Sequence, residues 1–147
     1  MTNAVTKLIL HAEDDPSHAA IVRRSIQRNF PDVQLMQVGD GKTALDYLYN
    51  SGSYADTVLS PSPELIILDL SMPLFSGIEV LSIIKKDPVL QTIPVVIMTT
   101  SDLAEERSEA NLCGADGFFT KPADFDKFID LINELCTVWL QVSVVKH

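Results

Sequence analysis

The stretch HAEDDPSH, residues 11–18, places three carboxylates in a row between two histidines. Imidazole beside carboxylate is typical of zinc or iron sites, whereas carboxylates alone are typical of magnesium or calcium sites. His11 is expected inside a strand and His18 about one turn into a helix, so neither histidine is expected to meet the acids. The pattern therefore favours a cation that binds oxygen, such as magnesium, over zinc.

Three residues far along the chain have the chemistry to act with these acids. Asp69 lies at the end of the apolar run ELIILDL, Thr99 near the end of IPVVIMTT, and Lys121 just after GFFT. An aspartate beside a magnesium ion and a lysine can attack phosphorus and form an acyl phosphate, while metal, lysine and a hydroxyl offset the charge on the phosphoryl oxygens. Alone, Thr99 could be an ordinary strand residue and Lys121 a solvated one. A carboxylate buried at the end of an apolar strand is costly unless it is paired or functional, so Asp69 is harder to explain in structural terms only.

One of the neighbouring acids has a competing structural explanation, because Asp14 or Asp15 could be only a helix cap. Asp15 directly precedes Pro16, a residue favoured at the first helical position, so Asp15 is the expected cap. Glu13 and Asp14 remain as the acids expected to hold the cation.

Bulk composition limits the class of protein. The chain has 147 residues, of which 46% are hydrophobic and 21% charged, as expected for one soluble globular domain with a core. A net charge of -9 argues against a protein that follows nucleic-acid phosphates. No apolar run reaches the roughly 18 residues that a membrane span needs, and the N-terminus makes a poor signal peptide. We expect a cytoplasmic protein with two reduced thiols, Cys113 and Cys136.

The order of expected elements is strand then helix, five times over. Apolar runs rich in Ile, Val and Leu, with two weaker runs, predict strands at 8–12, 33–38, 64–70, 93–100 and 117–120. Helical spacing predicts helices at 16–30, 41–50, 77–87, 103–115 and 125–140. The inward faces of the first three helices are expected at Ala19, Val22 and Ile26, at Ala44, Leu45 and Leu48, and at Ile78, Leu81 and Ile84.

This alternation predicts an α/β fold with a doubly wound, flavodoxin-like parallel sheet of five strands in the order 2-1-3-4-5 and five helices. We expect residues 1–147 to form a single domain with its core at 7–135, an exposed loop at 50–63 and an extension at 136–147. Ligands of such sheets bind beyond the carboxyl ends of the strands. The acidic pair, Asp69, Thr99 and Lys121 should therefore converge on one rim.

Four stretches resemble the signature blocks of the two-component response-regulator receiver domain: LILHAEDD, LIILDLSMPLFSG, PVVIMTTS and GADGFFTKP. The resemblance extends from about Lys7 to about Leu135. It implies that Asp69 accepts a phosphoryl group from a histidine kinase, and that Glu13, Asp14, Asp69 and the backbone carbonyl of Ser71 hold Mg²⁺.

The same resemblance assigns the remaining site residues. It implies that Lys121 is the active-site lysine and that Pro122 follows it through a cis bond. Thr99 would follow the phosphoryl group on activation, while Phe118 would be the aromatic switch residue. The implied protein is a switch that changes protein contacts and catalyses only its own phosphoryl transfer and loss.

The sequence departs from the family pattern at several positions. His11 and Ala12 stand where aliphatic residues are usual, so the first strand is expected to pack less tightly there. Phe75 and Ser76 occupy variable places after the phosphorylation site. Phenylalanine in place of tyrosine at 118 removes a hydroxyl that some outputs use.

The long loop at 50–63 and the tail TVWLQVSVVKH further resemble the single-domain regulators of cyanobacterial and bacterial phytochrome kinases. That resemblance implies a phytochrome-like kinase as partner. The net charge and the short apolar runs add the expectation that neither nucleic acid nor membrane is bound. It also implies a homodimer through the face of the expected elements 103–115, 117–120 and 125–140. The apolar tail could extend this interface or could pack on its own last helix.

Two other classes compete with the receiver interpretation. A phosphatase of the haloacid-dehalogenase type would use Asp69 as nucleophile, but it needs a second aspartate two residues later, where Ser71 stands. A flavodoxin, or a degenerate module that is not phosphorylated, is also conceivable. The complete acidic set argues against degeneracy, and no phosphate-cradling loop rich in Ser, Thr and Gly follows the first strand.

Overall fold

The fold is a five-stranded parallel sheet with helices on both faces, as seen in a computed structural model that describes residues 7–55 and 62–145. The strand order is β2-β1-β3-β4-β5, which confirms the expected doubly wound topology. The strands are β1 (Leu8–Ala12), β2 (Gln34–Val38), β3 (Leu65–Leu68), β4 (Val95–Thr99) and β5 (Gly117–Thr120). The helices are α1 (Pro16–Asn29), α2 (Gly41–Tyr49), α3 (Gly77–Lys86), α4 (Ala104–Leu112) and α5 (Phe125–Trp139).

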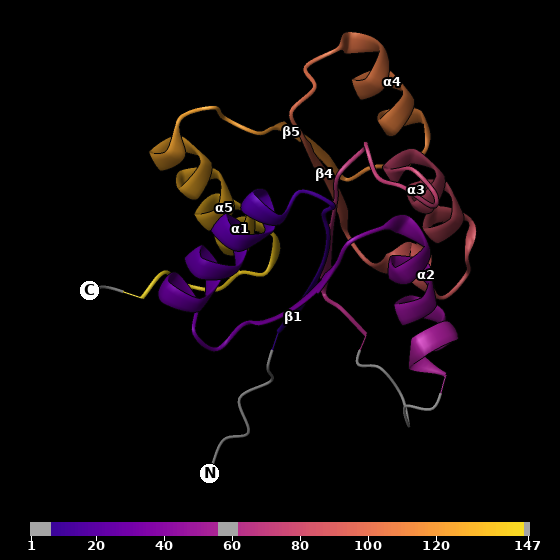
Figure 1. Cartoon of the computed structure of the whole chain (residues 1–147), viewed down its shortest axis with the longest axis horizontal. Helices are drawn as coiled ribbons and strands as arrows, with labels where there is room; N and C mark the ends of the chain where they lie inside the picture. The colour runs from indigo at the N-terminus through magenta and orange to yellow at the C-terminus, as the bar shows by residue number, and fades with distance from the viewer. Residues whose placement is uncertain (1–6, 56–61, 146–147) are drawn as a thin grey trace.

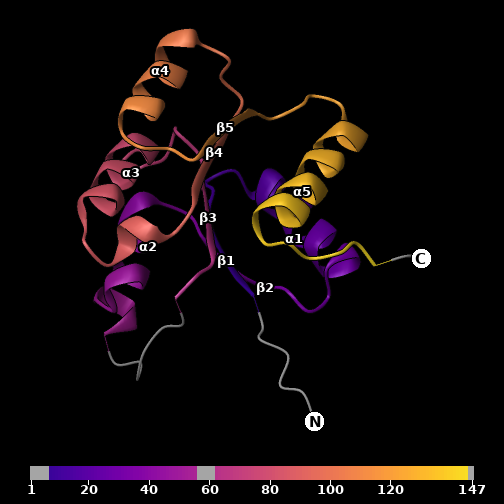
Figure 2. The same ribbon diagram turned by 180° about the vertical axis from the view of Figure 1, so that it is seen from behind.

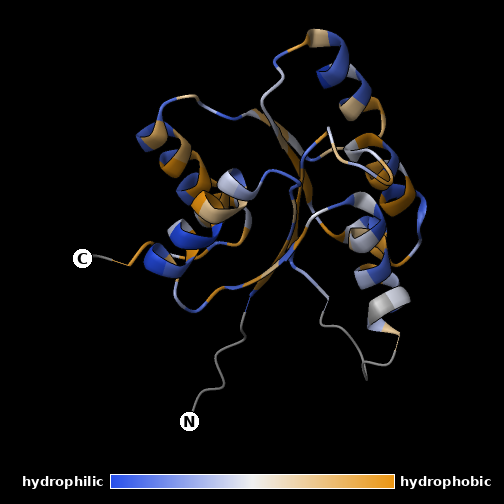
Figure 3. Cartoon of the chain, in the orientation of Figure 1, coloured by the Kyte–Doolittle hydropathy of each residue, from blue (hydrophilic) through white to orange (hydrophobic). Residues whose placement is uncertain are grey.

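Two layers of helices cover the sheet. Figure 1 shows α1 and α5 on one face and α2, α3 and α4 on the other, and the view from behind in Figure 2 agrees. Each layer closes over its own apolar core: Ile9, Val22 and Phe128 belong to the core under α1 and α5, and Leu10 and Leu81 to the core on the opposite face. The three central strands are buried along their whole length, which explains why their sequences show no alternation. Figure 3 shows the hydrophobic residues gathered on the strands and on the inner sides of the helices.

The helix boundaries follow from capping residues. The side chain of Asp15 accepts hydrogen bonds from the amides of Ser17 and His18, so Asp15 caps α1 as expected. Ser76 and Glu79 form a reciprocal capping box that starts α3 directly after the loop that follows β3. These caps fix where each helix begins relative to the rim of the sheet.

The expected inward residues are partly confirmed. Those that are buried as expected are Val22, Ile26, Ala44, Leu81 and Ile84, whereas Ala19, Leu45, Leu48 and Ile78 are only half-buried. Tyr47 takes the inward position of α2 instead of Leu45 or Leu48. It lies three residues after Ala44 on the same helix face, and its ring packs edge-on against Tyr54, with centroids 5.2 Å apart.

The tail packs against its own chain near the end of α1. Leu140 is buried, and the amide of Val145 donates to the carbonyl of Asn29 over 2.8 Å. Val138 and Val144 stay exposed. The exposed loop expected at 50–63 includes a short 3-10 turn at Gly52–Tyr54, and residues 56–61 of that loop lie outside the described part.

The loop between β3 and α3 leans on the start of α2. Leu74 and Phe75 have positive φ angles of 51° and 77°, and the amide of Gly41 donates to the carbonyl of Pro73 over 3.3 Å. A Cβ atom at position 41 would lie 2.8 Å from the Leu74 carbonyl oxygen, so only glycine lets the loop approach this closely.

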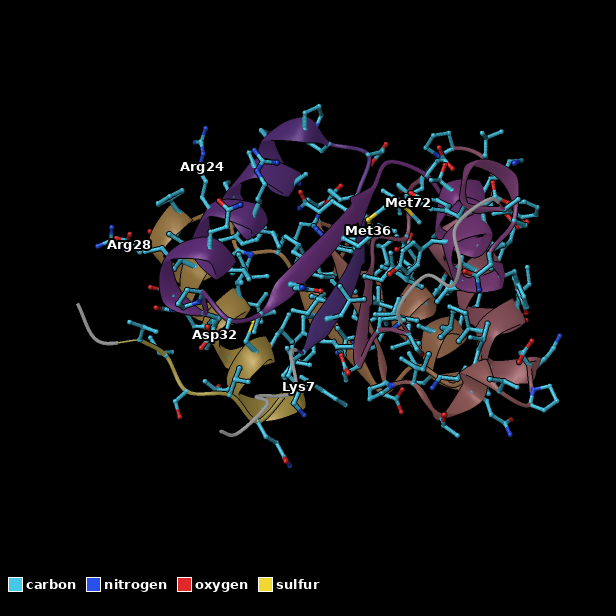
Figure 4. All side chains as sticks on the ribbon, turned by 90° about the horizontal axis from the view of Figure 1, so that it is seen from below. Lys7, Arg24, Arg28, Asp32, Met36 and Met72 are labelled. Atoms are coloured by element: carbon cyan, nitrogen blue, oxygen red, sulfur yellow. The ribbon has the colours of Figure 1, made fainter. Side chains whose placement is uncertain are left out.

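The surface of α1 is locally basic although the chain is acidic. Arg24 and Arg28 are exposed and point away from the helix (Figure 4). None of the helices in the described residues has the length and apolar character that crossing a membrane requires.

Candidate functional site

The acids and the lysine selected from the sequence meet at the carboxyl end of the sheet. Glu13 follows β1, Asp69 follows β3 and Lys121 follows β5, and all three are buried. They line a depression of about 230 Å³, whose walls are Glu13, Asp14, Asp15, His18, Asp69, Ser71, Thr100 and Lys121. The convergence expected from parallel strands is therefore observed for these three residues.

Lys121 connects the two buried carboxylates. Its Nζ atom donates to Asp69 Oδ2 over 2.8 Å and also to Glu13 Oε1. The side chain of Lys121 is only 2% exposed. A buried charge is tolerated when it is paired and hydrogen-bonded, so the ammonium offsets the cost of burying both acids.

A cation can be held beside this pair. One oxygen from each of Glu13, Asp14 and Asp69 lies within 4.8 Å of the others. Asp14 is exposed, and Ser71 lines the depression while its amide donates to Asp69 Oδ1 over 3.1 Å. Three carboxylates without thiolate fit a hard divalent cation that prefers oxygen ligands.

Burial shifts the pKa of Glu13, which lines the site, and of His11, which lies in β1. Burial raises the pKa of Glu13 to about 7; the hydrogen bond from Lys121 works against this rise and the charge of Asp69 adds to it. Burial, and then the positive charge of Lys121, lowers the pKa of His11 to about 3. His11 lies inside β1 as expected, where Gln37 Nε2 donates to its Nδ1 over 3.1 Å.

Thr99 ends β4 and is 2% exposed. Its hydroxyl faces the backbone of the turn that follows β4. Its Oγ1 accepts from the amide of Ser101 over 3.3 Å, and its carbonyl accepts from the amide of Lys121. Thr100, not Thr99, lines the depression. The structure therefore puts Thr99 next to the site with its hydroxyl engaged elsewhere.

Phe118 is buried beneath α4. The guanidinium carbon of Arg107 lies 4.7 Å from the centre of its ring, and Arg107 Nη1 donates to the Phe118 carbonyl over 3.4 Å. A cation over an aromatic face is attracted to it, so Arg107 favours the inward position of the ring.

The expectation of a cis bond before Pro122 is wrong in this structure. Residues 7–55 and 62–145 contain no cis peptide bond, so Pro122 follows Lys121 through a trans bond. The trans form is also the intrinsically favoured one for a bond to proline, by about 0.5–1 kcal/mol.

The expectation that His18 lies away from the acids is also wrong. Its Nδ1 lies 3.0 Å from Lys121 Nζ and 3.9 Å from Glu13 Oε1. A signal was present in the sequence: with Asp15 as cap, His18 falls in the first turn of α1. Side chains there tilt toward the helix N-terminus, which here faces the rim of the sheet.

Comparisons with known proteins agree with this geometry. The sequence model of the response regulator receiver domain matches residues 9–133. Response regulator Rcp1 of Synechocystis sp. is 31% identical over 135 residues, which cover 92% of this chain and 90% of Rcp1.

Solved structures of response regulators, one of them a phytochrome response regulator, share the fold. Phosphorylated cyanobacterial RcpA aligns with a TM-score of 0.86 and 28% identity, over 97% of this chain and 100% of RcpA. The Mn²⁺-bound form of Rcp1 aligns with a TM-score of 0.84 and 30% identity, over 95% of this chain and 99% of that one. Neither these proteins nor the family match support the phosphatase alternative. The chain therefore belongs to the response regulator receiver domain family.

Proposed function

We propose that Asp69 accepts a phosphoryl group from the phosphohistidine of a sensor kinase. An Asp69 carboxylate oxygen would bond to phosphorus as the phosphorus–nitrogen bond of the donor breaks, which leaves an acyl phosphate. The observation that carries this proposal is the position of Asp69: its Oδ2 accepts from Lys121 and its Oδ1 from the Ser71 amide. Phosphorylated RcpA, a relative of known structure, supports it.

We further propose that Glu13, Asp14 and Asp69 hold Mg²⁺ together with the carbonyl of Ser71. When bound, the cation supplies positive charge that offsets the charge on the transferring phosphoryl group. The clustering of the three carboxylates supports this assignment, and Rcp1 has been crystallised with Mn²⁺. Lys121 would direct an N–H to the same phosphoryl oxygens.

Thr99 and Phe118 are proposed to report the phosphorylated state. The Thr99 hydroxyl accepts a hydrogen bond from the Ser101 amide. On phosphorylation it would turn away from that amide and donate to a phosphoryl oxygen. Phe118 lies between β4 and Arg107 of α4, so a change at Thr99 would alter the outer surface of α4. The protein would thus act as a switch, with no catalysis beyond its own phosphoryl transfer and loss.

A phytochrome-like histidine kinase is the proposed donor, because the similar protein RcpA is a phytochrome response regulator. We also propose that residues 7–135 form the core of the receiver domain, with an extension at 136–147 that begins inside α5. A cytoplasmic homodimer through the face formed by α4, β5 and α5 is proposed; the tail lies against α1 through the bond from Val145 to Asn29 and is left out of that face. Size-exclusion chromatography with light scattering tests the dimer.

The test of phosphorylation is direct. The protein is incubated with Mg²⁺ and a small phosphodonor, and intact mass spectrometry is expected to show the gain of one phosphoryl group. Asp69→Asn should abolish this gain, and Asp14→Ala should slow it and weaken Mg²⁺ binding without unfolding the protein. A gain that survives in Asp69→Asn refutes the assignment of the acceptor, and unchanged Mg²⁺ affinity in Asp14→Ala refutes that ligand.

A further inference from the structure

We propose that His18 is a positioning residue that aims the Lys121 ammonium at the phosphoryl group, an inference that rests on the phosphoryl transfer proposed above. The imidazole Nδ1 lies 3.0 Å from Lys121 Nζ, and His18 lines the same depression as Asp69. An ammonium can only donate, so the geometry assigns the acceptor role to Nδ1.

Packing holds the imidazole in this place. The His18 amide donates to the Asp15 side chain over 3.3 Å, which fixes the first turn of α1. The ring also contacts Phe128 of α5, with ring centroids 5.8 Å apart and planes tilted by 58°. Two helices therefore fix the acceptor against which Lys121 rests.

The three partners of Lys121 differ in what binding a cation would do to them. Its ammonium has three N–H groups and three partners: Glu13, Asp69 and His18. Glu13 and Asp69 are also two of the three carboxylates proposed to bind Mg²⁺, so the cation competes with Lys121 for their oxygens. His18 carries no oxygen ligand, and its bond to Lys121 leaves the other two N–H groups free to follow the phosphoryl oxygens.

Loss of this third partner has a specific consequence. Without His18 the ammonium is held by Glu13 and Asp69 alone. In that position it competes with Mg²⁺ for the carboxylate oxygens and is poorly placed to donate to the phosphoryl oxygens. Misplacing a charge-stabilising group lowers the rate of the chemical step more than the affinity for the donor. We expect a roughly tenfold slower maximal rate of phosphorylation, with little change in the donor concentration that gives half that rate.

Two variants separate positioning from packing. His18→Leu fills similar space but has no acceptor, whereas His18→Asn carries an amide oxygen near the place of Nδ1. Phosphorylation by a small phosphodonor at saturating Mg²⁺ is followed for both and for the unsubstituted protein. His18→Met, a second apolar variant, replaces His18→Leu if circular dichroism shows that the latter is unfolded.

The expected result is a slow apolar variant and an asparagine variant whose maximal rate recovers most of the loss. Equal rates in the apolar variant and the unsubstituted protein would overturn the inference, as would equal losses in the apolar and asparagine variants. If the unsubstituted protein takes up no phosphoryl group, the proposed function itself fails. Phosphorylation of the unsubstituted protein with no effect at position 18 rejects only the role of His18.

Discussion

Replacing His11 by leucine should remove a large part of the sensitivity of this protein to acid. His11 is 1% exposed, and its pKa is lowered from 6.5 to about 3. The folded protein therefore keeps His11 neutral at pH values where the unfolded chain has already bound a proton. A lowered pKa contributes stability that is complete above about pH 6.5 and is lost as the pH falls toward 3.

The magnitude follows from the difference between the two pKa values. Between pH 3 and 6.5 the free energy of unfolding should fall by about 1.4 kcal/mol for each pH unit, because the unfolded state binds one more proton. Lowering the pH from about 7.5 to about 5 should thus cost about 2 kcal/mol through His11 alone. Glu13 acts in the opposite direction: its raised pKa gives stability below about 4.5 that is lost as the pH rises through about 7.

The assay is urea unfolding of the unsubstituted protein and of His11→Leu at several pH values, without added metal. All other groups titrate in both proteins, so the difference between their free energies of unfolding isolates position 11. That difference should move by about 2 kcal/mol in favour of the leucine variant on going from about pH 7.5 to about 5. A constant difference over this range would refute the reasoning, whatever the absolute stability of the variant.

Three further predictions concern the site and the opposite end of the sheet. Mg²⁺ affinity, measured by titration calorimetry, should weaken below about pH 7 by up to about tenfold for each pH unit, because the cation must displace the proton of Glu13. An affinity that does not depend on pH contradicts this prediction. Asp116→Ala should cost about 1–3 kcal/mol in urea unfolding, since it leaves the Val95 amide without its acceptor at 2.8 Å and breaks the 2.9 Å ion pair with Lys85. Asp116→Asn keeps the acceptor and should cost less than half as much; equal costs would mean that the ion pair dominates. Gly77→Ala should lower the free energy of unfolding by about 1–3 kcal/mol in the same assay, because the added Cβ would lie 2.9 Å from the Cα of Leu70. An unchanged urea midpoint would show that the loop after β3 shifts to accept the methyl group at little cost.

Sequence reasoning predicts the topology and most of the site because both depend on regular periodicity. Buried parallel strands lack alternation, and the residue after such a strand lies at the rim whatever the details of packing. This is why the order of residues along the chain is enough to predict that Glu13, Asp69 and Lys121 meet.

The features that sequence reasoning misses depend on side-chain direction. Whether the Thr99 hydroxyl turns to the site or to Ser101 is a choice of rotamer that residue type does not determine. The position of His18 one turn into α1 predicts that it lies away from the acids. Side chains of a helix tilt toward its N-terminus, and this tilt brings His18 to Lys121 and Glu13 instead. Tyr47 escapes a search for aliphatic stripes because it is aromatic and carries a hydroxyl, yet it is buried.

The close approach of the β3–α3 loop to Gly41 limits which segments of related proteins can be exchanged. The carbonyl of Leu74 would meet any Cβ at position 41, although the two positions are far apart in the sequence. A chimera that receives this loop from a relative must receive a glycine at the start of α2 with it. Conversely, a loop without the positive φ angles of Leu74 and Phe75 would free position 41 for alanine, which favours a helix.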